Sequence, residues 1–121
     1  MFREKAKTEP VTINEMKGGK KYVLKYSYIG DQNEYFTPYA DVVSKLVLVP
    51  GASIGYHSHV GNEETIVVLS GRAKCTDDGE VYEMAPCDAT ICRENHFHSI
   101  ENLSETEDLE VMAIVIKTPQ A

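Results

Sequence analysis

Short apolar segments, separated by turn residues at intervals of roughly ten positions, run through most of this chain. Pro50-Gly51 and Asp77-Asp78-Gly79 are two such turn signals. This spacing is typical of an all-β sandwich or barrel, and no long amphipathic helix pattern competes with it. The predicted strands are residues 20–29, 42–49, 53–60, 63–69, 71–76, 80–84, 89–92, 96–101 and 109–117.

Two histidines, His57 and His59, are separated by a single residue. In a β-strand, side chains two positions apart point to the same face with Cα atoms about 6.6–7 Å apart. Both imidazoles can then reach one ion at about 2.1 Å from a ring nitrogen. On a helix the same side chains lie on nearly opposite sides and cannot chelate together. The pair therefore predicts a strand and a metal site.

Glu64 follows His59 at an odd offset, which an unbroken strand would place on the opposite face. Gly61 and Asn62 lie between them and form a turn signal. We therefore predict that the two flanking strands form a hairpin, which would bring Glu64 back beside His59. His98 is too distant in sequence for a local contact, so only tertiary pairing can bring it to the same point.

Size and charge narrow the class of protein. The 121 residues suit a single domain with one core. The N-terminus has positive charge but no apolar block after it, and no apolar run is long enough to cross a bilayer. We therefore expect a cytoplasmic protein without a membrane partner. The net charge of −7 and the pI near 5.0 argue against nucleic acid as a partner.

Three cysteines, Cys75, Cys87 and Cys92, lack the C-x-x-C spacing. We expect three free thiols, and one bridge between two of them is the alternative. Nearer the N-terminus, Thr12 to Glu15 has the pattern of a capping box, but two glycines limit any helix there to about one turn. Residues 31–41 read as a loop whose aromatic side chains either cover a barrel mouth, join a subunit interface, or pack beneath the loop itself.

This chain resembles the cupin superfamily. It matches the first motif of that superfamily, G-x5-H-x-H-x4-E-x6-G, at every fixed position. Its residues are Gly51, His57, His59, Glu64 and Gly71.

The second cupin motif, G-x5-P-x-G-x2-H-x3-N, is matched only in part. His98 and Asn102 are in place, whereas Cys87, Arg93 and Asn95 stand where the motif has Gly, Pro and Gly. Asn enters the left-handed region readily, so Asn95 is the mildest departure. Cys87 lacks the backbone freedom of the glycine that it replaces. Arg93 lacks the fixed φ of the proline that it replaces.

The resemblance spans about residues 43–117, and it implies a conical antiparallel β-barrel, a jelly-roll-like double sheet. We expect one domain overall, with a barrel core over residues 42–121. Residues 1–41 would form an N-terminal strand and loop region that packs on the barrel or on a dimer partner. Many small single-domain cupins pair as dimers, so the resemblance also implies a homodimer.

Four side chains are the metal ligands that the resemblance implies: His57, His59, Glu64 and His98. Three imidazoles and one carboxylate suit one divalent ion of Mn, Fe, Co, Ni, Cu or Zn rather than Ca or Mg. An octahedral shell would leave two places open for water or substrate.

Arg93, Glu94 and His96 come just before His98 and are the candidate catalytic residues. Arg93 could clamp a carboxylate, and Glu94 or His96 could move protons. We place His96 at the mouth rather than as a fifth ligand. Asn102, by analogy with the family, would close a strand end by hydrogen bonding.

Two functions remain open from the sequence. The favoured one is a small metal-dependent enzyme acting on an oxygen-rich metabolite, such as a sugar acid or a carboxylate, by isomerase, decarboxylase, lyase or oxygenase chemistry. The alternative is a non-catalytic cupin that binds a metal or small ligand as a sensor or partner subunit. A purely structural barrel with empty histidines is a minority hypothesis.

Overall fold

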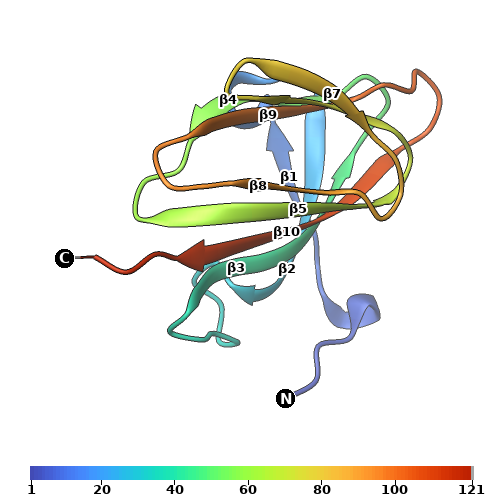
Figure 1. Cartoon of the computed structure of the whole chain (residues 1–121). Helices are drawn as coiled ribbons and strands as arrows, with labels where there is room; N and C mark the ends of the chain where they lie inside the picture. Colours follow the sequence, from blue (N-terminus) through green and yellow to red (C-terminus); the bar gives the residue numbers. More distant parts are fainter. Residues whose placement is uncertain (121) are drawn as a thin grey trace.

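Two antiparallel β-sheets face each other in the computed structural model, which describes residues 1–120. The larger sheet has the strand order β1-β2-β3-β10-β5-β8, and the smaller has the order β4-β9-β6-β7. Figure 1 shows the smaller sheet lying over the larger one. The arrangement is the double sheet of a jelly roll, so the predicted all-β fold is confirmed. Ala121, the last residue of the predicted barrel core, lies outside the described residues.

The strands follow the predicted segments closely. Their bounds are β1 Val11–Asn14, β2 Tyr22–Gly30, β3 Ala40–Leu48, β4 Ser53–Ser58, β5 Asn62–Ser70, β6 Ala73–Asp77, β7 Glu80–Met84, β8 Ala89–Cys92, β9 Phe97–Asn102 and β10 Leu109–Lys117. Two short 3₁₀ turns, Lys5–Lys7 and Met16–Gly18, complete the described elements. Among residues 1–120, no helix has the length and apolar character needed to cross a bilayer.

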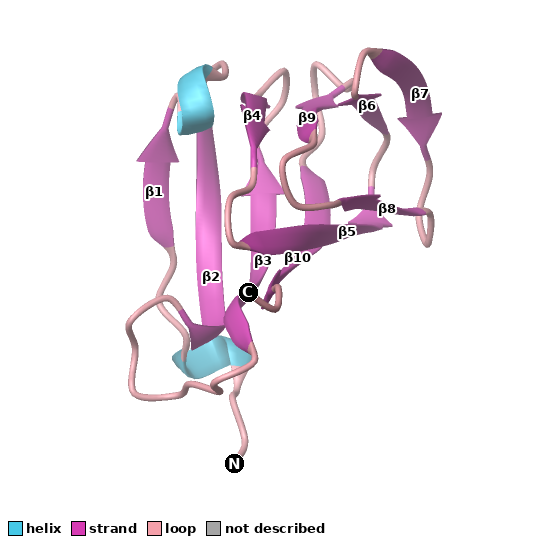
Figure 2. Cartoon of the chain, turned by 60° about the vertical axis from the view of Figure 1, so that its left-hand side comes forward, coloured by secondary structure: helices cyan, strands magenta, loops and turns pink. Residues whose placement is uncertain are grey.

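The N-terminal strands extend the larger sheet, as Figure 2 shows. β1 pairs with β2, and β2 pairs with β3. The possible capping box does not form, because Thr12 lies within β1 and pairs with Leu24, and the helical turn that follows is the 3₁₀ turn Met16–Gly18, which ends at the glycines. Pairing with β2 satisfies the backbone of this segment, and a helix of about one turn is too short to compete with it.

The predicted hairpin between the segments before and after Gly61 was wrong. β4 pairs with β9 in the smaller sheet, whereas β5 pairs with β10 and β8 in the larger one. The loop through Gly61, whose φ is +78°, therefore carries the chain from one sheet to the other. A tight hairpin would have left both strands in one sheet, with only one of their faces available to the core. Crossing between the sheets lets β4 and β5 face each other across the barrel.

Apolar side chains from both sheets fill the barrel interior. Leu46, Leu48, Ile66, Val68 and Val111 are at most 2% exposed, and each such side chain stabilises the fold by about 1.5–3 kcal/mol through burial. Successive inward positions on β3 and β10 are apolar with one exception, Ser44. The core therefore packs one part of the barrel and leaves a cavity in the rest.

The turn glycines and their substitutes adopt the backbone that the motifs require. Gly51 and Gly71 have φ values of +73° and +93°. Cys87 and Asn95, which stand where the second motif has glycines, have φ values of +75° and +68°. The chain thus keeps the left-handed turns before His98 without the glycines that usually form them, at a cost in strain that is larger for Cys87.

Asn102 closes a strand end, as predicted. Its side-chain amide donates hydrogen bonds to the carbonyl oxygens of Leu48, Val49 and Glu107, at 3.0, 3.2 and 2.8 Å. Its Oδ1 accepts a hydrogen bond from the backbone N–H of Ser104 at 2.9 Å. Because Asn102 is 2% exposed, these bonds tie the end of β9 to the end of β3 without competition from water.

Candidate metal centre

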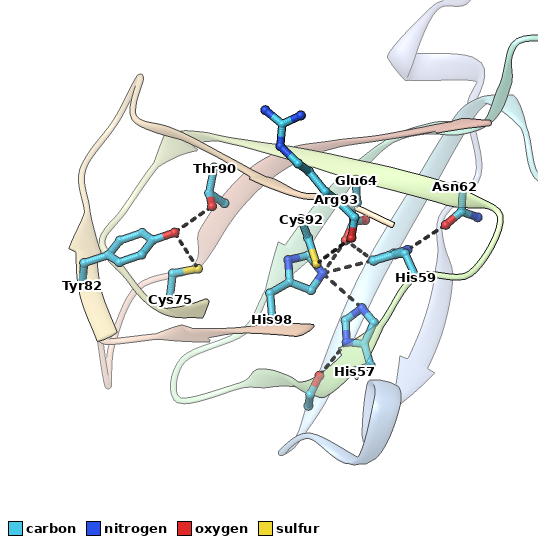
Figure 3. Close-up of polar contacts among 11 residues, drawn as sticks. His57, His59, Asn62, Glu64, Cys75, Tyr82, Thr90, Cys92, Arg93 and His98 are labelled. Atoms are coloured by element: carbon cyan, nitrogen blue, oxygen red, sulfur yellow. Dashed lines mark hydrogen bonds and ion pairs between the residues drawn. The ribbon is translucent and has the colours of Figure 1, made fainter. Parts of the chain in front are cut away.

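His57, His59, Glu64 and His98 converge at one point inside the barrel (Figure 3). Their ligand atoms all lie within 4.8 Å of one another. His98 Nε2 is 3.2 Å from His57 Nε2, 3.1 Å from His59 Nε2 and 3.0 Å from Glu64 Oε1. Glu64 Oε1 is also 3.2 Å from His59 Nε2. The four residues predicted from the sequence are therefore brought together.

A β-bulge in β4 positions His57. Ile54 pairs with Ile100 of β9 and His57 pairs with His98, with a register shift between the two pairs. Three positions separate Ile54 from His57, so a regular strand would point them to opposite faces. The bulge resets this alternation, and both side chains can face the barrel interior.

Glu64 reaches the site from the larger sheet. It lies on β5 opposite Cys92 of β8 and Val115 of β10. Its side chain is 12% exposed, and burial opposes its ionisation, but hydrogen bonds with His59 and His98 hold the pKa of its carboxyl at about 2. Glu64 is therefore a carboxylate at neutral pH and offers negative charge to a cation.

Hydrogen bonds on the far side of two imidazoles fix their tautomers. His57 Nδ1 is 2.7 Å from the Gly55 carbonyl oxygen, which can only accept, so Nδ1 carries the proton. His59 Nδ1 is 3.1 Å from Asn62 Oδ1, and the Asn62 amide donates to Asp41 Oδ2 at 2.8 Å. Because that amide group faces Asp41, Oδ1 faces His59 and accepts its Nδ1 proton. The neutral forms of both rings therefore present Nε2 lone pairs to the centre.

Lone pairs that face one another at these distances repel unless a cation lies between them. Two ligand atoms at right angles on one ion, each about 2.1 Å from it, are about 3.0 Å apart. The four short distances among the ligand atoms, 3.0 to 3.2 Å, are close to that value. The donor set and its spacing are thus consistent with one metal ion, whose identity the geometry does not specify.

A cavity of about 240 Å³ opens beside this centre. Three of the four predicted ligands, His57, His59 and Glu64, line it, and His98 is buried. Its other lining residues are Met16, Lys17, Lys25, Asp41, Val42, Ser44, Leu46, Ile54, Asn62, Ala113 and Val115. Lys17, Lys25 and Ser44 did not stand out in the sequence. The signal that could have found the last two is their position in the strands. Lys25 lies two residues from buried Val23, and Ser44 two residues from buried Leu46, so each shares an inward face with an apolar core residue.

Arg93, Glu94 and His96 do not line this cavity. The side chain of Arg93 is exposed and leads away from the histidines in Figure 3. Glu94 accepts a hydrogen bond from the Gly61 N–H at 2.7 Å, and His96 pairs with Asp78 on the surface. All three lie in the segment that joins β8 to β9, beside the loop that carries His59, so their predicted catalytic roles stay a prediction.

The cysteines and the aromatic loop complete the predicted features. Cys75, Cys87 and Cys92 are all free, and Cys75 and Cys92 are buried. In the loop of residues 31–41, Phe36 and Tyr39 are 72% and 76% exposed, and neither lines the cavity.

The double sheet and its interior cluster of three histidines and one glutamate, which could hold a metal ion, define a β-barrel protein of the cupin kind. A family model described as a cupin domain matches residues 44–115, more than half of the 121-residue chain. The chain belongs to the cupin family.

A sequence match and a structure match both come from Thermotoga maritima. An oxalate-binding protein is 32% identical over 107 residues, which cover 88% of this chain and 86% of that protein. A crystal structure of a predicted oxalate decarboxylase matches with a TM-score of 0.87 and 28% identity, over 98% of this chain and 100% of that one. KdgF from Halomonas sp. matches with a TM-score of 0.80 over 99% and 96% of the two chains, but at 15% identity this likeness shows the fold alone.

Proposed function

We propose that this cupin binds small carboxylates of the oxalate type through one divalent transition metal ion held by His57, His59, Glu64 and His98. The observation that carries the proposal is the convergence of these ligand atoms, with the lone pairs of two rings fixed by their Nδ1 hydrogen bonds, on the wall of an internal cavity. The Thermotoga relatives, whose names refer to oxalate, support this ligand class.

The ligand chemistry favours Mn, Fe, Co, Ni, Cu or Zn, because imidazole nitrogens bind these ions better than they bind Ca or Mg. When bound, such an ion supplies a Lewis acid that accepts carboxylate oxygens. The cation also explains how an anion enters a chain with a net charge of −7, because the negative field would otherwise repel it.

Binding, rather than turnover, is what the geometry supports best. The three candidate catalytic residues, Arg93, Glu94 and His96, lie outside the cavity lining. Catalysis is the second candidate, and Lys17 and Asp41 favour it because these proton-exchanging groups line the cavity.

Isothermal titration of oxalate into tagless, metal-loaded protein tests the proposal. We expect one oxalate per chain, and no binding after the metal is removed or in His59→Ala. Absence of binding to protein shown by elemental analysis to be metal-loaded would overturn it. Release of CO2 from oxalate or malonate, measured on the same samples, would show turnover in place of binding alone.

We also propose a homodimer, as the family resemblance implies. The outward face of the larger sheet carries half-buried apolar side chains from three neighbouring strands: Val43 on β3, Met112 and Ile114 on β10, and Val67 on β5. Apolar patches of this kind often mark protein contacts. Light scattering should give twice the chain mass, and Ile114→Glu should give a monomer, whereas the control Val81→Glu on the other sheet should not. A monomeric parent protein would contradict the proposal.

A further inference from the structure

The cavity is larger than a metal-bound oxalate requires. Its volume of about 240 Å³ would hold roughly eight water molecules at about 30 Å³ each. Oxalate consists of two directly bonded carboxylates, so chelation at the metal would use both of its ends. The wall of the cavity formed by β2, β3 and β10 would then remain without a ligand.

Ser44 is an uncharged polar residue on that wall, which also includes Lys25 and Asp41. It lies on β3, is 1% exposed and lines the cavity. Its Oγ is buried and has no hydrogen-bond partner anywhere in residues 1–120. Its cross-strand neighbour on β10 is Ala113, which also lines the cavity. A buried hydroxyl without a partner is costly, and such groups are therefore uncommon unless a ligand or water satisfies them.

Two lysines add positive charge to the same cavity. Lys25, on β2, is largely buried, and its ammonium pairs with Asp31 at 2.9 Å. Lys17 lies in the turn Met16–Gly18 with a φ of +55°, a strained conformation for a residue other than glycine.

The turn that carries Lys17 packs tightly against the strand that carries His57. A Cβ added at Gly55 would lie 2.1 Å from the Lys17 carbonyl oxygen, so only glycine allows this contact. The same Gly55 accepts the Nδ1 proton of His57. Gly55 therefore contacts both the turn that carries Lys17 and the ring of His57. The position of Lys17 is thus coupled to that of a predicted metal ligand.

The charges around the cavity favour an anionic ligand once the metal is bound. Lys17 and Lys25 balance Asp41 and Glu64 among the lining residues, and Asp31, which pairs with Lys25, adds one negative charge. A divalent ion at the centre makes the total positive. Burial of a charge is costly unless it is balanced, so an anion is favoured there.

We propose that the cavity takes a dicarboxylate longer than oxalate, with one end at the metal and the second carboxylate accepting a hydrogen bond from Ser44 beside the ammonium groups of Lys17 and Lys25. This inference rests on the proposed function, which supplies the metal-bound end. It adds the length of the ligand and the residues that select it.

One matched pair of acids tests the proposed length of the ligand. Tagless, metal-loaded protein is titrated calorimetrically with 2-oxoglutarate and with 2-oxopentanoate, which has the same carbon chain but lacks the second carboxylate. We expect 2-oxoglutarate to bind about tenfold or more tightly than 2-oxopentanoate, the ratio for one charge-assisted hydrogen bond. Succinate and oxalate complete the series.

Variants of the wall test the residues. Ser44→Ala should reduce the preference for 2-oxoglutarate about tenfold or more and leave the affinity for 2-oxopentanoate unchanged. It should also raise the melting temperature of the ligand-free protein, because the unpartnered hydroxyl is removed. A residue with a purely structural role would not give these opposite effects. Lys17→Met should weaken 2-oxoglutarate binding, whereas the control Lys20→Met, at a nearby exposed lysine, should not.

The outcomes separate this inference from the proposed function. If oxalate binds and the longer diacids do not, or if Ser44→Ala and Lys17→Met keep the parent preference, the inference is overturned and the proposed function stands. If neither oxalate nor any longer acid binds metal-loaded protein, both are overturned.

Discussion

His57 and His98 are direct partners across β4 and β9, and their Nε2 atoms lie 3.2 Å apart. The first of these rings carries its proton on Nδ1, bound to the Gly55 carbonyl oxygen. A metal ion between the rings could accept one coordinate bond from each Nε2 atom. The pairing of β4 with β9 therefore places two of the four predicted ligands, His57 and His98, directly opposite each other.

Loss of one ligand should abolish stable metal binding. Tagless protein is expected to contain close to one transition metal ion per chain by elemental analysis. His98→Ala should lower the metal affinity by more than about 100-fold, because removal even of a group that only supports a ligand costs 10–100-fold. His96→Ala is the matched control, since His96 pairs with Asp78 on the surface and should keep the metal. Equal metal content in both variants would contradict the assignment of His98.

Acid should release the metal before it unfolds the protein. Burial lowers the pKa of His57, whereas the hydrogen bond with Glu64 raises the pKa of His59. As the pH falls, His59 is therefore protonated first and loses its lone pair. We expect release over about pH 5–6.5, followed with a colorimetric chelator. Retention of the metal at pH 4 would contradict this order.

The fold lowers the pKa of Glu64, whereas it raises the pKa of His59. Because the pKa of Glu64 falls from its ordinary 4.5 to about 2 in the fold, its contribution to stability is present above 4.5 and is lost as the pH falls toward 2. Circular dichroism should therefore show the metal-free fold persisting to a lower pH than metal binding. Coincident loss of both signals would contradict this prediction.

Cys87→Gly should stabilise the protein. Cys87 is exposed and has a φ of +75°, where a side chain costs about 1–2 kcal/mol that glycine does not incur. Glycine loses more backbone entropy on folding, so we expect a net gain of about 0.5–1 kcal/mol in the free energy of unfolding. Urea denaturation measures this gain, and Cys87→Ser, which removes the thiol but keeps Cβ, should show none. A gain with serine alone would assign the effect to the thiol.

Asn102→Ala should cost about 2–4 kcal/mol in the free energy of unfolding, because it removes three hydrogen bonds that a side chain only 2% exposed donates to carbonyl oxygens. Asn102→Asp keeps the shape but replaces the donating amide with an acceptor, so we expect a loss at least as large at neutral pH. Both are measured by urea denaturation against Ser104→Ala, a change at a more accessible position of the same loop. A cost below that of Ser104→Ala would show that the amide does not hold the strand ends.

Local features predictable from the sequence were the strand segments, the shared face of His57 and His59, and the residues of the metal cluster. The alternation of side chains along a strand is set by the backbone alone, so two histidines one residue apart can be placed without knowledge of their partners. Glu64 was placed correctly for a wrong reason, since its position depends on a crossing between sheets rather than on a hairpin.

Strand partners, and hence the surroundings of the cluster, were decided by the tertiary structure. Which sheet a strand joins depends on burying apolar surface contributed by distant segments, and nothing in the local alternation specifies those segments. The sequence by itself therefore determined which side chains can hold a metal. Only the fold decided that Gly55 and Asn62 orient the rings, and that Ser44 and Lys17, rather than Arg93, line the cavity.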